Sequence, residues 1–145
     1  MGFKCRPPLI PPEHGLSGAE VNKLKKAIRS FIPAATTMGC ATRYGAYGKC
    51  NTMSDMFLHE LEKVGLEGLI EAYEFADKRG PCTQEQMDQD RMDYPFHVDI
   101  YDCAWHWAVR VGNIVIDWTA KQFNRAAPFP AIWFSEKRPW RNCED

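Results

Sequence analysis

The sequence predicts an α+β fold in which N-terminal helices pack on a C-terminal antiparallel sheet. In the first half, residues 17–32 and 50–64 repeat apolar side chains at helical spacing. Beyond residue 95 the composition changes, and aromatic and β-branched residues dominate segments 96–101 and 104–118, as they do in strands. Helices followed by strands are typical of α+β domains rather than of βαβ arrays.

Length and composition fit one globular domain. The 145 residues, 45% of them hydrophobic and 26% charged, are enough to bury a core. A net charge of −1 argues against a nucleic-acid-binding protein. No apolar run has the length of a signal peptide core or of a membrane span, so we expect a cytoplasmic protein that binds no membrane. The predicted organisation is an extended, proline-rich arm over residues 1–16 and a single domain over residues 17–145.

The first predicted helix follows the arm. Ser17 and Glu20 have the spacing of a capping box, in which each side chain bonds to the backbone of the other residue. Apolar positions continue to Ile32, and Pro33 is expected to end the helix because proline lacks the N–H group that the next turn needs. Residues 34–49 are rich in glycine and small residues and are expected to form a loop.

Two more helices are predicted before the sheet. The second begins at Cys50 and ends at Val64, and Gly65 is a suitable stop. Its apolar stripe is formed by Met53, Phe57, Leu61 and Val64. A third helix is expected over residues 66–78, and the polar segment 83–95 is expected to be a loop.

The most informative segment is a predicted β-hairpin with Gly112-Asn113 as its two-residue turn. If Val111 pairs with Ile114, the two faces of the hairpin differ sharply in composition. One face carries large apolar side chains only: Trp105, Trp107, Val109, Val111, Ile114, Ile116 and Trp118. The other face is polar and places His106 and Asp117 as diagonal neighbours, near enough for a hydrogen bond between their side chains.

A carboxylate beside an imidazole orients the ring, favours its protonated form and leaves the second ring nitrogen for a nucleophile. Cys50 is the best candidate nucleophile, because a helix N-terminus stabilises a thiolate and its first N–H groups can bind an oxyanion. Cys40 is the second candidate. The remaining cysteines are expected to be structural or to lie in loops and tails: Cys5, Cys82, Cys103 and Cys143. A chance pairing of His106 with Asp117 on a half-exposed face is the simpler alternative.

A cysteine at a helix start, followed by histidine on one strand and aspartate on the next, resembles the papain-like and transglutaminase-like superfamily of cysteine enzymes. The resemblance covers about residues 45–123 and is carried by Gly48-Lys49-Cys50, by His106-Trp107-Ala108-Val109 and by Val115-Ile116-Asp117-Trp118-Thr119. Its Asp-x-Thr ending is similar to the transglutaminase-like branch. The resemblance implies a papain-like/transglutaminase-like core for the domain.

The resemblance also implies acyl transfer without a metal or a cofactor, on a protein or peptide substrate. Cys50 attacks an amide or ester carbonyl, His106 transfers protons, and Asp117 orients His106. Amide hydrolysis by a peptidase or a glutamine deamidase is the interpretation we favour, and transglutaminase-type transfer to an amine is the alternative. Papain-like peptidases carry a glutamine shortly before the cysteine as an oxyanion donor, whereas this chain has Arg43, Tyr44 and Tyr47 there.

Two other classes of protein remain open from the residues alone. A metal-binding protein is one, because four potential ligands lie close in sequence: His97, Asp99, Cys103 and His106. A non-catalytic binding module is the other, because segments 126–134 and 137–140 are aromatic and rich in proline. The simpler interpretation of this tail is a strap that packs its rings across the edge of the sheet.

Overall fold

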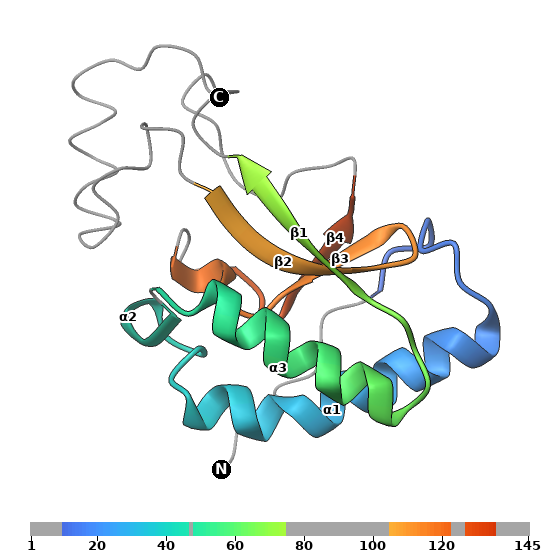
Figure 1. The fold of residues 1–145 in the computed structure, drawn as a ribbon, viewed down its shortest axis with the longest axis horizontal. Coiled ribbons are helices and arrows are strands. Elements are labelled where there is room, and N and C mark those ends of the chain that lie inside the picture. Colours follow the sequence, from blue (N-terminus) through green and yellow to red (C-terminus); the bar gives the residue numbers. More distant parts are fainter. Residues whose placement is uncertain (1–9, 47, 75–104, 123–126, 136–145) are drawn as a thin grey trace.

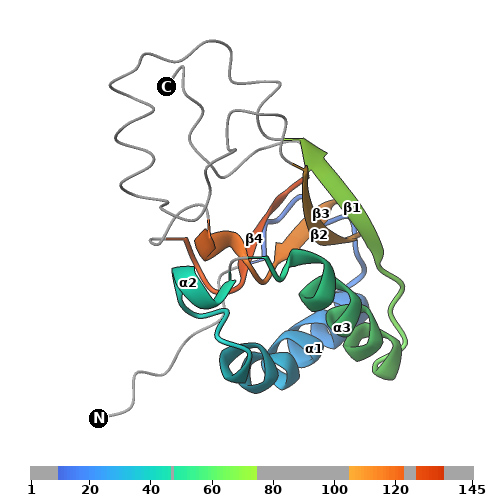
Figure 2. The same ribbon diagram turned by 60° about the vertical axis from the view of Figure 1, so that its left-hand side comes forward.

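The computed structural model describes residues 10–46, 48–74, 105–122 and 127–135. The helices and strands follow one another as α1 (Gly18–Thr37), α2 (Arg43–Ala46), α3 (Cys50–Lys63), β1 (Leu69–Glu74), β2 (Trp105–Val111), β3 (Ile114–Asp117), the 3-10 helix η2 (Ala120–Gln122) and β4 (Ala131–Phe134). The strands form one antiparallel sheet in the order β1-β2-β3-β4. Helices α1 and α3 lie together on one side of this sheet (Figures 1 and 2), and the predicted α+β class is confirmed.

Helix α1 continues through Pro33 to Thr37, so the prediction that Pro33 ends the helix is wrong. Pro33 and Arg29 are both exposed, and water can bond the Arg29 carbonyl in place of the missing N–H group. The predicted capping box is present: Ser17 Oγ accepts from the Glu20 N–H at 3.1 Å, and Glu20 Oε1 accepts from the Ser17 N–H at 3.0 Å. The buried side of α1, which extends beyond the proline, consists of Leu24, Ala27, Ile28, Phe31 and Ala35.

Helix α3 is the second predicted helix, and it begins at Cys50 as expected. It ends where Gly65 takes a positive φ of 77°, a conformation that favours glycine. The preceding segment is not the continuous loop predicted for residues 34–49, because α1 runs on to Thr37 and residues 43–46 form α2.

The predicted third helix over residues 66–78 is wrong, because residues 69–74 form strand β1. Leu, Glu and Ala in this segment are good helix formers, but the backbone pairs with β2 from Leu69↔Arg110 to Glu74↔Trp105. Ladder pairing and packing override local propensity here. The end of the predicted helix, the predicted loop 83–95 and the predicted strand 96–101 lie outside the described residues.

The hairpin register is confirmed, since Val111 pairs with Ile114 across the turn. Gly112 is required there, because its φ is 58° and an added Cβ would lie 2.5 Å from the His14 carbonyl oxygen. The His14 carbonyl also accepts from the Asn113 N–H at 2.9 Å, so the described part of the arm lies against the turn. Within the tail, residues 131–134 form strand β4, which pairs with β3, rather than a strap across the sheet edge, and segment 137–140 lies outside the described residues.

The core lies between the two long helices and the apolar face of the hairpin. Trp118 is at its centre, with ring centroids 4.7 Å from Phe31, 5.2 Å from Phe57 and 5.6 Å from Phe129. The predicted core residues of the hairpin are buried in this cluster where their side chains are described, apart from half-buried Trp107. Within the described ranges, no helix combines the length and apolar character that a membrane crossing requires.

Candidate active site

His106 and Asp117 face each other from neighbouring strands. His106 lies on β2, and its Nε2 is 2.5 Å from Oδ2 of Asp117 at the end of β3. This is the predicted contact. Both side chains are only 1% exposed, so the half-exposed face of the simpler alternative is not what the structure shows. The described side chains of that face are buried throughout the site region: His106, Ala108, Val115, Asp117 and Thr119.

The second oxygen of the Asp117 carboxylate is bonded as well. Oδ1 accepts from the backbone N–H of Thr119 at 2.8 Å and lies 3.2 Å from Thr119 Oγ1. A buried carboxylate is tolerated when its lone pairs are bonded and a positive partner is near. His106 supplies that positive partner when its ring is protonated.

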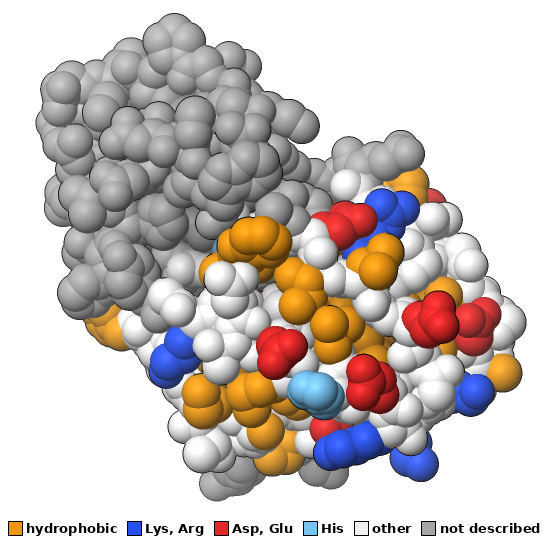
Figure 3. Space-filling model, viewed as in Figure 1, with side chains coloured by type: hydrophobic (Ala, Val, Ile, Leu, Met, Phe, Trp, Pro, Cys, Tyr) orange, Lys and Arg blue, Asp and Glu red, His pale blue; other side chains and the backbone are white. Residues whose placement is uncertain are grey.

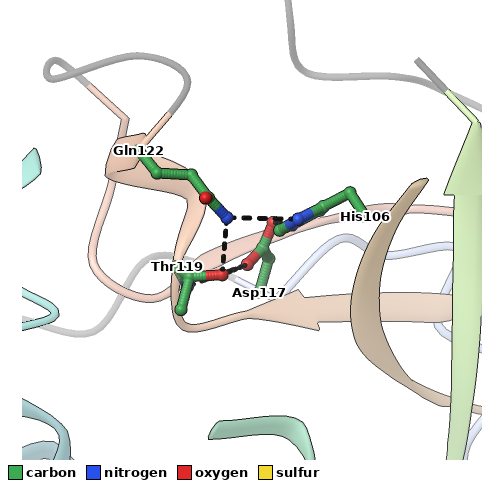
Figure 4. A network of polar contacts seen from close by, with 4 residues as sticks. All are labelled: His106, Asp117, Thr119 and Gln122. Atoms are coloured by element: carbon green, nitrogen blue, oxygen red, sulfur yellow. Dashed lines mark hydrogen bonds and ion pairs between the residues drawn. The ribbon is translucent and has the colours of Figure 1, made fainter. Parts of the chain in front are cut away.

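Gln122 completes a ring of polar contacts, and Figure 4 shows the four side chains turned toward one another. Its Nε2 lies 3.2 Å from Nδ1 of His106 and 3.3 Å from Oγ1 of Thr119, and the residue is 5% exposed. Gln122 is not among the site residues predicted from the sequence. The available signal was its spacing from Thr119, because the 3-10 turn η2 brings residues three apart to the same side.

Cys50 reaches this site from the start of α3. Its half-buried thiol hydrogen-bonds with the His106 ring and with the backbone N–H of Trp107. Burial raises the pKa of the thiol, while the hydrogen bond and the charge of His106, together with the Trp107 N–H, lower it; Asp117 opposes them. The balance places the pKa of Cys50 below its ordinary value, which increases the fraction of reactive thiolate.

His106 holds its proton tightly. Burial lowers the pKa of the ring, but the charge and hydrogen bond of Asp117, followed by the contacts with Cys50, raise it from 6.5 to about 9. An acidic thiol beside a basic imidazole favours a thiolate–imidazolium pair at neutral pH.

Cys40, the second candidate nucleophile, lies in a different environment. It is fully buried in the core cluster, and burial raises the pKa of its thiol; Lys49 lowers this pKa and Asp117 raises it further. The remaining cysteines lie outside the described residues: Cys5, Cys82, Cys103 and Cys143. Of the two described thiols, Cys50 is therefore the one with the character of a nucleophile.

The first turn of α3 offers backbone N–H groups beside the thiol. Lys49, at the N-cap, makes no side-chain capping bond, and Asn51 and Thr52 are exposed. A helix start whose backbone N–H groups lack a side-chain cap attracts negative charge. Of the residues that replace the expected glutamine donor, Tyr44 is 60% exposed in α2, and Tyr47 lies outside the described residues.

The alternative metal site is only partly described. His97, Asp99 and Cys103 lie outside the described residues, and both ring nitrogens of His106 contact Asp117 or Gln122. Across the ranges that the structure describes, no group of three or more His, Cys, Asp or Glu side chains is arranged to hold a metal ion.

A separate groove of about 460 Å³ opens between the end of α3 and the start of β1. Figure 3 shows apolar side chains bordered by acidic ones on this face. Leu58, one of the lining residues, is about 12 Å from Cys50 along the helix axis, at 1.5 Å per residue. Neither Cys50, His106 nor Asp117 lines the groove, so it is separate from the candidate site.

Comparisons of the chain with protein-family models, with curated proteins and with solved structures returned no match. A functional proposal therefore depends on the chemistry of the contacts among Cys50, His106 and Asp117.

Proposed function

We propose that the protein is a cysteine-dependent acyl-transfer enzyme that hydrolyses amide bonds, as a peptidase or a glutamine deamidase. One observation carries the proposal: the Cys50 thiol bonds to the His106 ring, and Nε2 of that ring bonds to Asp117. Because Nε2 is bonded to the Asp117 carboxylate, we infer that the thiol addresses Nδ1, the nitrogen that Gln122 also contacts. This order of nucleophile, base and orienting carboxylate agrees with the papain-like and transglutaminase-like resemblance of the sequence.

In the proposed reaction, the Cys50 thiolate attacks the carbonyl carbon of an amide. The His106 imidazolium gives its proton to the leaving nitrogen, which departs as an amine or as ammonia, and a thioester remains on Cys50. Neutral His106 then takes a proton from water, whose oxygen attacks the thioester and releases the acid. The thiolate and the imidazolium are restored, and Asp117 orients the ring throughout.

The first-turn N–H groups of α3 are the proposed oxyanion donors. They adjoin the nucleophile, they lack a side-chain cap, and the helix dipole favours negative charge at this end. This assignment replaces the glutamine donor that papain-like peptidases use and that the sequence lacks before Cys50.

Selective alkylation tests the nucleophile. We expect limiting iodoacetamide at pH 6 to modify Cys50 at least about tenfold faster than the other cysteines, because its thiolate fraction is larger. Peptide mapping by mass spectrometry identifies the labelled residue. Cys50→Ala should remove the fast phase, whereas the matched Cys40→Ala should keep it. Equal, slow labelling of all thiols would refute the proposed nucleophile.

An assay with casein as a general protein substrate distinguishes the possible reactions. Ammonia release without new N-termini indicates a deamidase, new N-termini indicate a peptidase, and incorporation of dansylcadaverine indicates transfer to an amine. Cys50→Ala should abolish whichever product forms, and a product that persists in this variant contradicts the proposed mechanism.

A further inference from the structure

The hydrogen bonds around Asp117 have a direction that follows from the number of hydrogens available. Thr119 Oγ1 carries one hydrogen and lies 3.2 Å from Asp117 Oδ1, an oxygen that only accepts when the carboxylate is ionised. The Thr119 hydrogen is therefore directed to Asp117. The lone pairs of Oγ1 remain, and they face Gln122.

This direction determines which end of the Gln122 amide faces the site. Thr119 Oγ1 accepts from Nε2 of Gln122 at 3.3 Å, so the amide presents its NH₂ group there. The second hydrogen of the same NH₂ group is available to Nδ1 of His106, which lies 3.2 Å away. Nδ1 can accept this hydrogen bond only when it carries no proton itself.

We propose that Gln122 is a positioning residue of the site: held in one orientation by Thr119, its amide donates to Nδ1 of the neutral His106 ring and makes that nitrogen less ready to take a proton. Gln122 thus opposes Asp117, whose carboxylate favours the protonated ring. Thr119 couples the two effects, because its hydroxyl donates to Asp117 and accepts from Gln122.

The groups that titrate around His106 are few within the described residues. Asp117 on β3 and Cys50 on α3 act on the ring directly. On β1, Tyr73 pairs with His106 in the ladder, and Glu71 is bonded to Arg110 at 3.1 Å. In η2 the residue in contact with the ring is the uncharged Gln122, which follows Lys121 in the chain.

The catalytic consequence rests on the proposed function, in which His106 gives a proton in one step and takes one in the next. Asp117 assists the first step by favouring imidazolium. Gln122 assists the second by favouring the neutral ring, and together they bring His106 nearer to the intermediate basicity that suits both steps. Gln122 also competes with the Cys50 thiol for the same nitrogen.

The test is an NMR titration of the His106 ring in a Cys50→Ala protein, where no catalytic activity is needed. The ring signal is assigned by its loss in His106→Asn. Gln122→Met keeps the size of the side chain but removes the donor, so the pKa of His106 should rise by about 0.5–1 unit. Gln122→Glu offers an acceptor to Nδ1 and should raise it at least as far.

A merely structural role for Gln122 predicts no rise in the pKa of His106 while the site stays closed. A loosened site would also shift this pKa, because weaker contact with Asp117 lowers it and relief of burial raises it, so the comparison is made only between variants whose near-UV circular dichroism matches that of the parent. A fall, or no change, in a variant that keeps its near-UV circular dichroism overturns the proposal. If Gln122→Met does not fold, Gln122→Leu, which also removes the donor and adds no charge, carries the same test. Thr119→Ser, which keeps the hydroxyl group, should retain the starting pKa.

The two proposals fail separately. A protein without acyl-transfer activity on any substrate still reports the effect of Gln122 on the His106 pKa. Conversely, if the enzyme is active but Gln122→Met leaves the pKa of His106 unchanged, the proposed function stands and the proposed role of Gln122 is refuted.

Discussion

Among single residues, Asp117 joins two members of the candidate site, because it contacts both His106 and Thr119. It is 1% exposed, and its two oxygens contact His106 on one side and the backbone and hydroxyl of Thr119 on the other. Burial penalises a lone carboxylate, and these contacts offset that penalty. The proton of His106 is therefore part of what makes the folded state stable.

This role predicts a pH dependence of stability. In Cys50→Ala, the pKa of His106 remains raised by Asp117, so the folded state binds the proton more tightly than the unfolded state. The resulting stabilisation is complete below pH 6.5, the ordinary pKa of the ring, and is lost as the pH rises toward the folded value, which is about 9 with Cys50 present. We expect urea unfolding free energies to fall by about 1–3 kcal/mol between pH 6 and pH 9.

Asp117→Asn, made in the Cys50→Ala protein, should reverse the direction in which the unfolding free energy changes with pH. Without the carboxylate, burial lowers the pKa of His106, and stability is then lost as the pH falls below 6.5. Equal slopes in the two proteins would show that Asp117 does not stabilise the protonated ring.

Among the elements, the short helix α2 links the loop before Cys50 to the candidate site. It lies beside η2 in both ribbon views (Figures 1 and 2), and η2 carries Gln122. Gly45 of α2 packs against Gly39, which lies two residues beyond the end of α1: an added Cβ would lie 2.0 Å from the Gly39 carbonyl oxygen and 2.8 Å from the Gly39 Cα. Only glycine allows this approach of two backbones.

Gly45→Ala should therefore destabilise the protein by about 1–3 kcal/mol, since both atoms in conflict belong to the backbone and one segment must move. Chemical denaturation measures the change. Gly18→Ala is the matched control, because an added Cβ at Gly18 meets nothing within 4 Å and alanine suits a helix. Equal stability of the two variants would contradict the close packing of α2 on the Gly39 segment.

At the scale of the whole molecule, one aromatic cluster holds the nucleophile against its partners. Phe57 lies on α3, the helix that begins with Cys50, and its ring centroid is 5.4 Å from Phe31 of α1. The Phe57 ring is also 5.2 Å from Trp118, which follows Asp117 in the chain. The core thus determines where α3 lies relative to the strands of His106 and Asp117.

Phe57→Leu should weaken both stability and the site. Loss of ring volume is expected to lower the unfolding free energy by about 1–2 kcal/mol and to loosen α3. The pKa of Cys50, measured from the pH dependence of its alkylation, should then move up toward its ordinary value. His59→Ala is the control on the same helix, because that side chain is exposed. A destabilised Phe57→Leu protein with an unchanged Cys50 pKa would show that the core does not position the thiol.

The features predicted correctly are those that depend on residues near one another in sequence. The capping box at Ser17 needs only a four-residue pattern, and the Gly112-Asn113 turn determines the hairpin register and with it the His106–Asp117 contact. The helix start at Cys50 follows from its apolar spacing. Alternation along the strands also predicted most of the core face.

Long-range packing decided the rest. The side chains of residues 69–74 suit a helix, yet pairing with β2 makes the segment a strand, and burial of Ala35 carries α1 past Pro33. The alternation of apolar and polar side chains separates the two faces of the hairpin. It does not tell whether other elements cover both faces, so the burial of His106 and Asp117 was not predicted. Local pattern thus determined which polar residues share a face, whereas the tertiary structure brought Cys50 and Gln122 to His106, because contacts between distant segments depend on how the elements pack.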